Sequence, residues 1–267
     1  MEELLRRCNH RFNELPYCSK GSCPSDCQKC LEDGWFDKTT EDYCKCEKKL
    51  YYYVANYGPS FASEICHYLS ASEILENKYS GKELRVLSLG CGASLDLIAI
   101  NKYLQDNGIS LRLKYHGVDI SPLWKEIRPN IAGDITYSQG NIVNGINMSG
   151  FNFIVMSKVF STINNNQLSN KYLDTVSNAI KDTLEAGAVL IFNDINNPYK
   201  AHKIFDEKIG PLFSNCRKYY FRKDSIYAKP DWIYIPNNEN VFSIPEESGI
   251  IHPLPTVRDV IVFEYTK

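Results

Sequence analysis

The sequence Arg85-Val-Leu-Ser-Leu-Gly-Cys-Gly-Ala-Ser94 decides the fold, because a short apolar run passes directly into a glycine-rich turn. Residues 85–89 predict a buried β-strand, and the periodic apolar residues of 95–105 predict a helix after the turn. The glycines permit a tight bend and let a ligand approach the backbone, while the helix directs its first N–H groups at that ligand. Strand, glycine turn and helix in this order favour a nucleotide-type cofactor site.

Strand and helix patterns alternate through the rest of the chain. Strands separated by helix-length segments predict an α/β, Rossmann-like, mainly parallel sheet with helices on both faces and right-handed crossovers. The Pro-, Asn- and Ser-rich residues 228–256 predict a long loop. The predicted strands are 85–89, 111–119, 135–138, 151–156, 188–192, 219–227 and 257–265, and the predicted helices are 95–105, 122–130, 169–184 and 199–213.

Polar residues follow the next three strands. Asp119 ends the second strand, 27 residues after Gly92. An acidic residue about 20 or more positions beyond such a turn can accept hydrogen bonds from both hydroxyls of a ribose. Gly140-Asn141-Ile142 follows the third strand, where an amide side chain can meet an adenine edge, and Ser157-Lys158 closes the fourth.

In these segments the chain resembles the class I S-adenosylmethionine-dependent methyltransferases. The resemblance rests on Leu87-Ser-Leu-Gly-Cys-Gly-Ala-Ser94, Gly117-Val-Asp119 and Gly140-Asn-Ile142, and in order and spacing it covers residues 84–267. It implies an enzyme that transfers a methyl group from S-adenosylmethionine to an acceptor that the sequence does not determine. It places Gly90 and Gly92 against the methionine part of the cofactor, and Asp119 on the ribose. The full set of expected cofactor-binding residues is Gly90, Cys91, Gly92, Ser94, Asp96, Asp119, Ile120, Asn141, Ile142, Ser157 and Tyr57.

Two positions depart from the family pattern. Ser88 stands where the family often has an acidic residue that contacts the cofactor's amino group, and we expect Asp96 to substitute for it. Ser94 replaces the usual third glycine, and we expect its hydroxyl to cap the following helix. A dinucleotide-binding fold remains the alternative for this site, and the missing third glycine counts against it.

The acceptor side offers few catalytic signals. Methyl transfer needs a lone pair in line with the methyl group, and positioning and desolvation can supply much of the rate without a general base. Ser157, Lys158 and Phe160 are the catalytic candidates, because they are expected to border the methyl group.

A helical segment precedes the first strand. Residues 41–77 predict a helix that Gly58-Pro59 breaks, with Ser60 capping its second half. Tyr57 and Glu64 flank this break and are expected to cover the cofactor, which is why Tyr57 belongs to the expected cofactor site.

Seven of the ten cysteines lie in the first 46 residues. Clustered thiols in a reducing compartment are more often metal ligands than disulfides, and two short knuckles can supply four thiolates to tetrahedral zinc. The predicted ligands are Cys23, Cys27, Cys30 and Cys44, with Cys18 and Cys46 in reserve and Cys8 or His10 as further ligands if two metals bind. Free thiols, disulfides and a four-iron cluster, suggested by the C-x3-C-x2-C spacing, remain open alternatives.

These segments predict three units. Residues 1–50 form a zinc-binding segment, 51–80 a helical cap or linker, and 81–267 the S-adenosylmethionine-binding domain, so that a small zinc-stapled helical cap is attached to the α/β core. A net charge of −2 and the absence of an apolar run of about 18 residues argue against a membrane partner. The start lacks the apolar stretch of a signal peptide, so we expect a cytoplasmic location.

Two other functions remain open at this point. Residues 217–223 interleave basic and aromatic side chains, which allows an RNA-modifying methyltransferase, although the balanced charge of the cysteine-rich segment does not favour a nucleic-acid partner. A protein that binds the cofactor without catalysis, and uses the zinc segment to contact another protein, is the other alternative.

Overall fold

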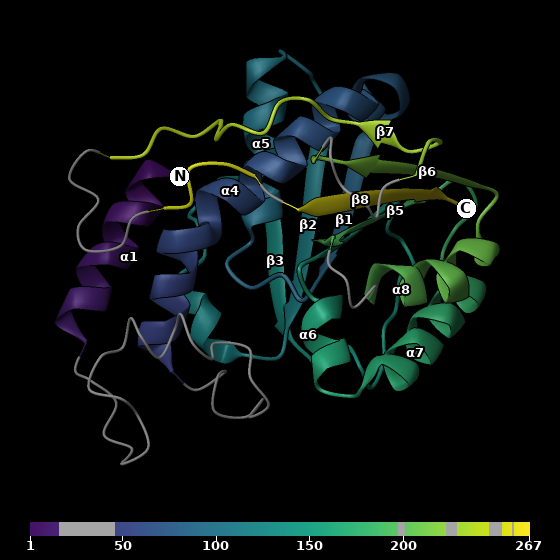
Figure 1. Ribbon diagram of the computed structural model, residues 1–267, viewed down its shortest axis with the longest axis horizontal. Coiled ribbons are helices and arrows are strands. Elements are labelled where there is room, and N and C mark those ends of the chain that lie inside the picture. The colour runs from purple at the N-terminus through teal and green to yellow at the C-terminus, as the bar shows by residue number, and fades with distance from the viewer. Residues whose placement is uncertain (16–45, 197–200, 223–228, 246–252, 258) are drawn as a thin grey trace.

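The computed structural model describes residues 1–15, 46–196, 201–222, 229–245, 253–257 and 259–267. Its centre is an eight-stranded sheet in the order β3-β2-β1-β4-β5-β8-β6-β7 (Figure 1). The strands are β1 (Glu83–Leu89), β2 (Arg112–Asp119), β3 (Asp134–Gln139), β4 (Phe153–Ser157), β5 (Val189–Ile195), β6 (Asn215–Tyr220), β7 (Ile233–Tyr234) and β8 (Val260–Thr266).

The sheet is mainly parallel, as predicted. Strands β3, β2, β1, β4 and β5 pair in parallel. This is the order of a doubly wound sheet, which reverses between β1 and β4, and ligands bind outside the carboxyl ends of strands at such a reversal. Strand β8 runs antiparallel between β5 and β6. The α/β prediction is confirmed, and the reversal marks the place for a site.

Helices cover both faces of the sheet. The helices α1 (Glu2–Glu14), α4 (Glu47–Ser72) and α5 (Leu95–Asp106) share one core cluster with Leu84 and Val86 of β1. The alternate residues Leu87 and Leu89 belong to a second cluster with α6, α7 and α8, because successive side chains of a strand point to opposite faces. Figure 1 shows α1 and α4 on one side of the molecule and α7 and α8 on the other. The second set comprises α6 (Phe160–Asn165), α7 (Ser169–Asp182) and α8 (Ala201–Ile209), and the short turns are η1 (Leu75–Tyr79), η2 (Pro122–Glu126) and η3 (Gly210–Leu212).

The predicted helix break at Gly58-Pro59 is wrong. Helix α4 is continuous through both residues, with Pro59 inside it. A proline costs about 3 kcal/mol in an isolated helix because it lacks an N–H and crowds the preceding turn. Here residues in the turns on both sides, such as Val54 and Ala62, are fully buried, and this packing offsets the loss. The Ser60 hydroxyl donates to the carbonyl of Thr256 (3.2 Å) instead of capping a helix.

Helix α1 lies in the predicted zinc-binding segment, residues 1–50. Its buried residues Leu4, Leu5, Cys8 and Phe12 recur at helical spacing and pack in the core. Arg7 donates to the backbone carbonyl of Ile127 (2.8 Å) and so ties α1 to the segment after η2. The beginning of the chain is therefore part of the core layer.

The predicted zinc ligands Cys23, Cys27, Cys30 and Cys44 and the reserve ligand Cys18 lie outside the described residues. The reserve ligand Cys46 is half-buried directly before α4. Cys8 is unsuited to join a second metal, because it is enclosed by the core and burial raises the pKa of its thiol to about 12. The described residues contain no group of three or more metal-ligating side chains. In the same residues, no helix has the length and apolar character to cross a bilayer.

Candidate functional site

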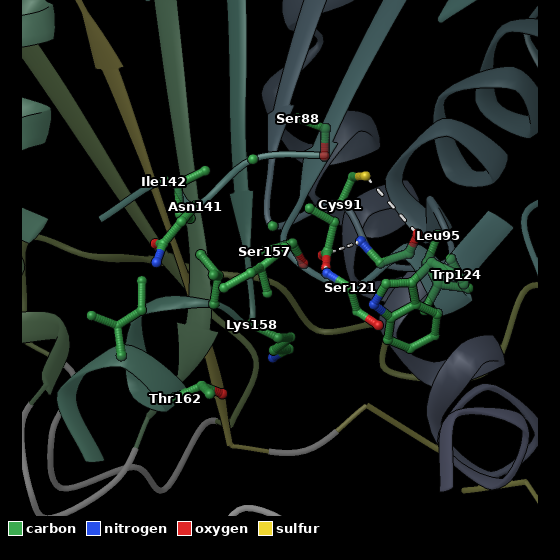
Figure 2. Close-up of a pocket in the computed structure, with 18 of the residues that line it drawn as sticks. Ser88, Cys91, Leu95, Ser121, Trp124, Asn141, Ile142, Ser157, Lys158 and Thr162 are labelled. Atoms are coloured by element: carbon green, nitrogen blue, oxygen red, sulfur yellow. Dashed lines mark hydrogen bonds between the residues drawn. The ribbon is translucent and has the colours of Figure 1, made fainter. Parts of the chain in front are cut away.

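A cavity of about 830 Å³ lies at the carboxyl ends of β1 and β4, where the strand order reverses. This volume is within the range of small-molecule sites. Figure 2 shows Ser88 and Cys91 from the first strand and turn, Asn141 and Ile142 after β3, and Ser157 at the end of β4 around one space. The expected site residues that line the cavity are Gly90, Cys91, Gly92, Asp96, Asp119, Ile120, Asn141, Ile142, Ser157 and Lys158.

The carboxylate of Asp119 joins the glycine turn to the end of β2. Its Oδ2 accepts a hydrogen bond from the Gly92 amide (2.9 Å), and its Oδ1 accepts one from the Ser121 amide (2.9 Å). A carboxylate oxygen can accept two hydrogen bonds, so each oxygen keeps one position for a ligand. Burial raises the pKa of Asp119, and the backbone amides of Ser121 and Gly92 oppose that rise.

The turn has room for no side chain at Gly90. Its φ is +70°, and an added Cβ would lie 2.5 Å from Cγ2 of Val159. Gly92 also has a positive φ, and an added Cβ there would lie 3.4 Å from the indole of Trp124. The two glycines therefore let the segments after β4 and after β2 close around the same cavity.

Ser94 does not cap α5, so this prediction is wrong. It is fully buried, has φ +57° and ψ +47°, and makes no side-chain capping bond. This left-handed conformation is one that glycine adopts without strain, which explains in physical terms why a glycine is usual here. Ser94 lies behind the turn and does not line the cavity.

Asp96 is a buried carboxylate with unused hydrogen-bonding capacity. It is only 4% exposed, and its Oδ1 accepts from the hydroxyl of Tyr115 (3.0 Å). Its Oδ2 is buried and makes no hydrogen bond of normal geometry within the described part of the chain, although Ser88 lies nearby. Burial raises the pKa of Asp96. A carboxylate in this state favours a positively charged ligand that supplies the missing donors.

One of the three catalytic candidates, Phe160, does not lie at the cavity. Its ring is fully buried in the second core cluster and packs against Phe192 and Phe205, at centroid distances of 6.0 and 5.3 Å. It does not line the cavity, because helix α6 begins at this residue and turns its side chain into the core. Ser157 and Lys158 do line the cavity.

Tyr57 does not line the cavity either. Because α4 is continuous, Tyr53, Tyr57 and Phe61 recur on one helical face, and the Tyr57 ring stacks on Phe61 at 5.5 Å. The outer two, Tyr53 and Phe61, line the cavity, and Tyr53 meets Trp124 edge-on at 6.0 Å. Glu64 is not a cover but a buried partner of Lys158, with their charged atoms 2.8 Å apart.

Several residues that line the cavity were not predicted from the sequence. The four-residue spacing of Tyr53, Tyr57 and Phe61 was a readable signal for a common helical face, but the break expected at Gly58-Pro59 concealed it. Trp124 follows β2 in η2, and no motif marked it. The further unpredicted lining residues include Leu95, Leu123, Val143, Thr162, Ile163, Asn166 and Leu168.

Comparisons with known proteins give structural neighbours only. No family model matches the chain, and no curated protein matches it. An amino pentose methyltransferase from Micromonospora echinaspora is 14% identical with a TM-score of 0.38, and the match covers 52% of each chain, about half the length of that protein. The N-methyltransferase NodS from Bradyrhizobium japonicum is 12% identical with a TM-score of 0.43 over 75% of this chain and 85% of NodS. A SAM dependent methyltransferase from Archaeoglobus fulgidus is 12% identical with a TM-score of 0.40 over 75% of this chain and 94% of the other.

These neighbours are S-adenosylmethionine-dependent methyltransferases. At such identities and scores, the similarity carries no argument about activity. The function of this protein is therefore inferred from the cavity and its residues.

The tight turn can be tested with a pair of glycine substitutions. Both Gly90→Ala and Gly187→Ala introduce a side chain at positive φ, which costs about 1 kcal/mol. Only Gly90→Ala also creates an overlap, with Val159, which adds about 1–3 kcal/mol. Chemical denaturation should show a larger loss of unfolding free energy for Gly90→Ala. Equal losses in the two variants would contradict the close packing at the turn.

Proposed function

We propose that this protein is an S-adenosylmethionine-dependent methyltransferase. The observation that carries the proposal is the hydrogen bond from the Gly92 amide to the Asp119 carboxylate, at the mouth of a cavity located where the strand order reverses. It supports a nucleoside ligand because the glycine turn and an acid with two open acceptor positions face the same space. When bound, the cofactor supplies an electrophilic methyl group on a sulfonium.

The cavity residues fit the parts of this cofactor. Asp119 would accept hydrogen bonds from the ribose hydroxyls, and Asn141 with Ile142 would flank the adenine. The turn at Gly90 would lie against the methionine portion, and the Asp96 carboxylate, whose buried Oδ2 makes no hydrogen bond of normal geometry in the described part of the chain, would receive its ammonium group. Ser88 stands where the family often has an acidic residue, and the buried carboxylate of Asp96 supports the expectation that Asp96 takes over its role.

A dinucleotide enzyme has less support. The doubly wound dinucleotide fold has a sixth parallel strand beside the fifth, whereas here the neighbour of β5 is the antiparallel β8. Ser94 also occupies the third glycine position of the fingerprint. Calorimetric titration with NAD and with S-adenosylhomocysteine separates the two.

The role of Asp119 predicts a loss of affinity in Asp119→Asn. The amide keeps one acceptor for the turn but loses the charge and an acceptor for the ribose, so we expect S-adenosylhomocysteine to bind at least about tenfold more weakly, or ~1.4 kcal/mol. Isothermal titration calorimetry measures this, with Asp134→Asn, an exposed aspartate of β3, as the control. Unchanged affinity in Asp119→Asn would remove the ribose role.

The role of Asp96 predicts a selective loss. In Asp96→Asn the carboxylate for the ammonium is gone, so affinity for S-adenosylhomocysteine should fall about tenfold. Affinity for 5′-methylthioadenosine, which has no ammonium group, should remain within about twofold of the wild-type value. A parallel loss for both ligands, measured by the same titration, would show that Asp96 supports the turn and does not recognise the ammonium.

The RNA-modifying alternative loses support from the charges of β6. Arg217 lies 3.5 Å from Glu264, and Lys218 forms an ion pair with Asp206. Charges that acidic neighbours already engage have less to offer a phosphate backbone. The proposed partners are the cofactor and a methyl acceptor of undetermined identity.

We retain zinc as a proposal for residues 1–50, supported by the density of cysteines in that stretch. We likewise retain a cytoplasmic location as a proposal, because zinc binding by these cysteines needs a compartment that keeps thiols reduced. In the non-catalytic alternative this segment would contact a partner, and methyl turnover separates that protein from an enzyme.

The zinc proposal predicts that Cys27→Ser loses metal and thermal stability together, because metal binding supplies folding free energy. Elemental analysis and thermal unfolding measure the two effects. Cys216→Ser, a half-buried cysteine outside the cluster, should keep the zinc. A Cys27→Ser protein with full metal content and stability would exclude Cys27 as a ligand, and a brown protein would favour the iron–sulfur alternative.

A further inference from the structure

A buried ion pair lies where β4 ends, in the wall of the cavity. Oε2 of Glu64 on α4 is 2.8 Å from Nζ of Lys158, and the two side chains are 1% and 6% exposed. Such a pair adds little stability, because removing two charges from water offsets most of their attraction. Lys158 also has a φ of +59°, a strained conformation for a residue with a side chain. Stability alone does not account for this arrangement, and its neighbours suggest a positioning role.

The Glu64 carboxylate fixes the orientation of Asn193 on β5. Nδ2 of Asn193 donates to Oε2 of Glu64 (3.0 Å), and a carboxylate can only accept. The opposite orientation would put the amide oxygen against the carboxylate oxygen. Burial raises the pKa of Glu64, and the ammonium of Lys158, 2.8 Å away, opposes that rise. The neighbouring carboxylate, Asp194, accepts hydrogen bonds from the backbone amides of Ser161 and Ile195.

The side-chain amide of Asn193 also orients the hydroxyl of Ser157. Nδ2 of Asn193 also donates to Oγ of Ser157 (3.3 Å), from the residue directly opposite in the β4–β5 pairing. This bond occupies one lone pair of the hydroxyl and leaves its hydrogen available. No hydrogen bond donated by Ser157 is found among the described residues, and the residue is half-buried in the cavity wall. Figure 2 shows Ser157 in the middle of the cavity wall, between Asn141 and Ser121.

We propose that Ser157 donates a hydrogen bond to the methyl acceptor, and that Glu64 and Asn193 are positioning residues that aim its hydroxyl. This inference rests on the proposed methyltransferase function. It is a recognition step and involves no covalent change at Ser157.

The surrounding wall indicates the chemical class of the acceptor. Tyr53, Phe61 and Trp124 line the cavity with aromatic rings. Lys158 is the one cation among the described lining residues, and its ammonium is buried against Glu64, 4.9 Å from the centroid of Phe61. Nothing in this described wall therefore offers an exposed positive charge to an anion. The geometry fits a largely apolar, aromatic molecule that offers Ser157 a neutral lone pair, such as that of a carbonyl oxygen or ring nitrogen, and receives the methyl group on a different atom or lone pair.

A matched pair of probes tests the donor. Quinoline and naphthalene have the same shape, but only quinoline has a lone pair in the ring plane. We expect quinoline to bind the S-adenosylhomocysteine complex of the wild-type protein at least about tenfold more tightly than naphthalene, measured by ligand-observed NMR titration. Ser157→Ala should bring the two affinities together, and Ser157→Cys, with a weak donor of similar size, should do nearly the same. Ser214→Ala removes an exposed hydroxyl directly before β6, and this variant should keep the preference for quinoline.

A wild-type protein without a preference for quinoline, or a preference that survives Ser157→Ala, would overturn the inference. Asn193→Leu, of similar shape, tests the positioning. It should reduce the quinoline preference while affinity for naphthalene and for S-adenosylhomocysteine stays the same. Equal losses for all three ligands would show a merely structural role. If the wild-type protein does not bind S-adenosylhomocysteine, the proposed function itself fails. If it binds S-adenosylhomocysteine and shows no preference between the probes, only this inference fails.

Discussion

The hydrogen bond between the Gly92 amide and the Asp119 carboxylate holds together the two strand ends on which the cavity is built. Strand β1 ends in the glycine turn, and β2 ends at Asp119, so the bond fixes the distance between a backbone turn and an acid. Gly117 of β2 must also be a glycine, because an added Cβ there would lie 2.7 Å from Sγ of Cys91 in the turn. The approach of β2 to the turn after β1 thus requires a glycine at position 117.

Helix α4 supplies the second constraint, by connecting the helical layer to the sheet at the cavity. Its residues Tyr53 and Phe61 form cavity wall, and Glu64, less than one turn later, reaches Lys158 after β4. A hydroxyl of Tyr68 on the same helix donates to Glu264 of β8 (2.7 Å). Buried polar contacts of this kind fix the position of a helix more narrowly than apolar packing, because an unmatched buried charge is costly. The position of α4 therefore determines the geometry of this part of the cavity wall.

Local pattern was enough to predict the first five strands and the polar residues near their ends that line the cavity, whereas the strand predicted over 219–227 lies at Asn215–Tyr220 and the short strand β7 lies in a predicted loop. Apolar runs bounded by Gly90, Asp119 and Asn141 mark strand ends, and parallel strands bring such ends to one edge of a sheet. The misplaced residues share a cause, which is that distant contacts override a local signal. Pro59 stays within a helix because packing on both sides supports it, and Phe160 turns inward because α6 starts there. The Glu64–Lys158 pair joins elements far apart in the chain, so no spacing in the sequence could have indicated it.

The two acids of the cavity differ in what a ligand would change. Asp119 already receives two backbone hydrogen bonds, so its carboxylate is positioned before any ligand arrives, and binding requires little reorganisation. Asp96 receives one from Tyr115 and keeps a buried oxygen without a good partner, so its burial is only partly compensated. A cationic group placed beside Asp96 would relieve that deficit, whereas a neutral group would not. With the proposed cofactor bound, Asp119 would hold the ribose in place, and Asp96 would favour a ligand that carries positive charge at its other end.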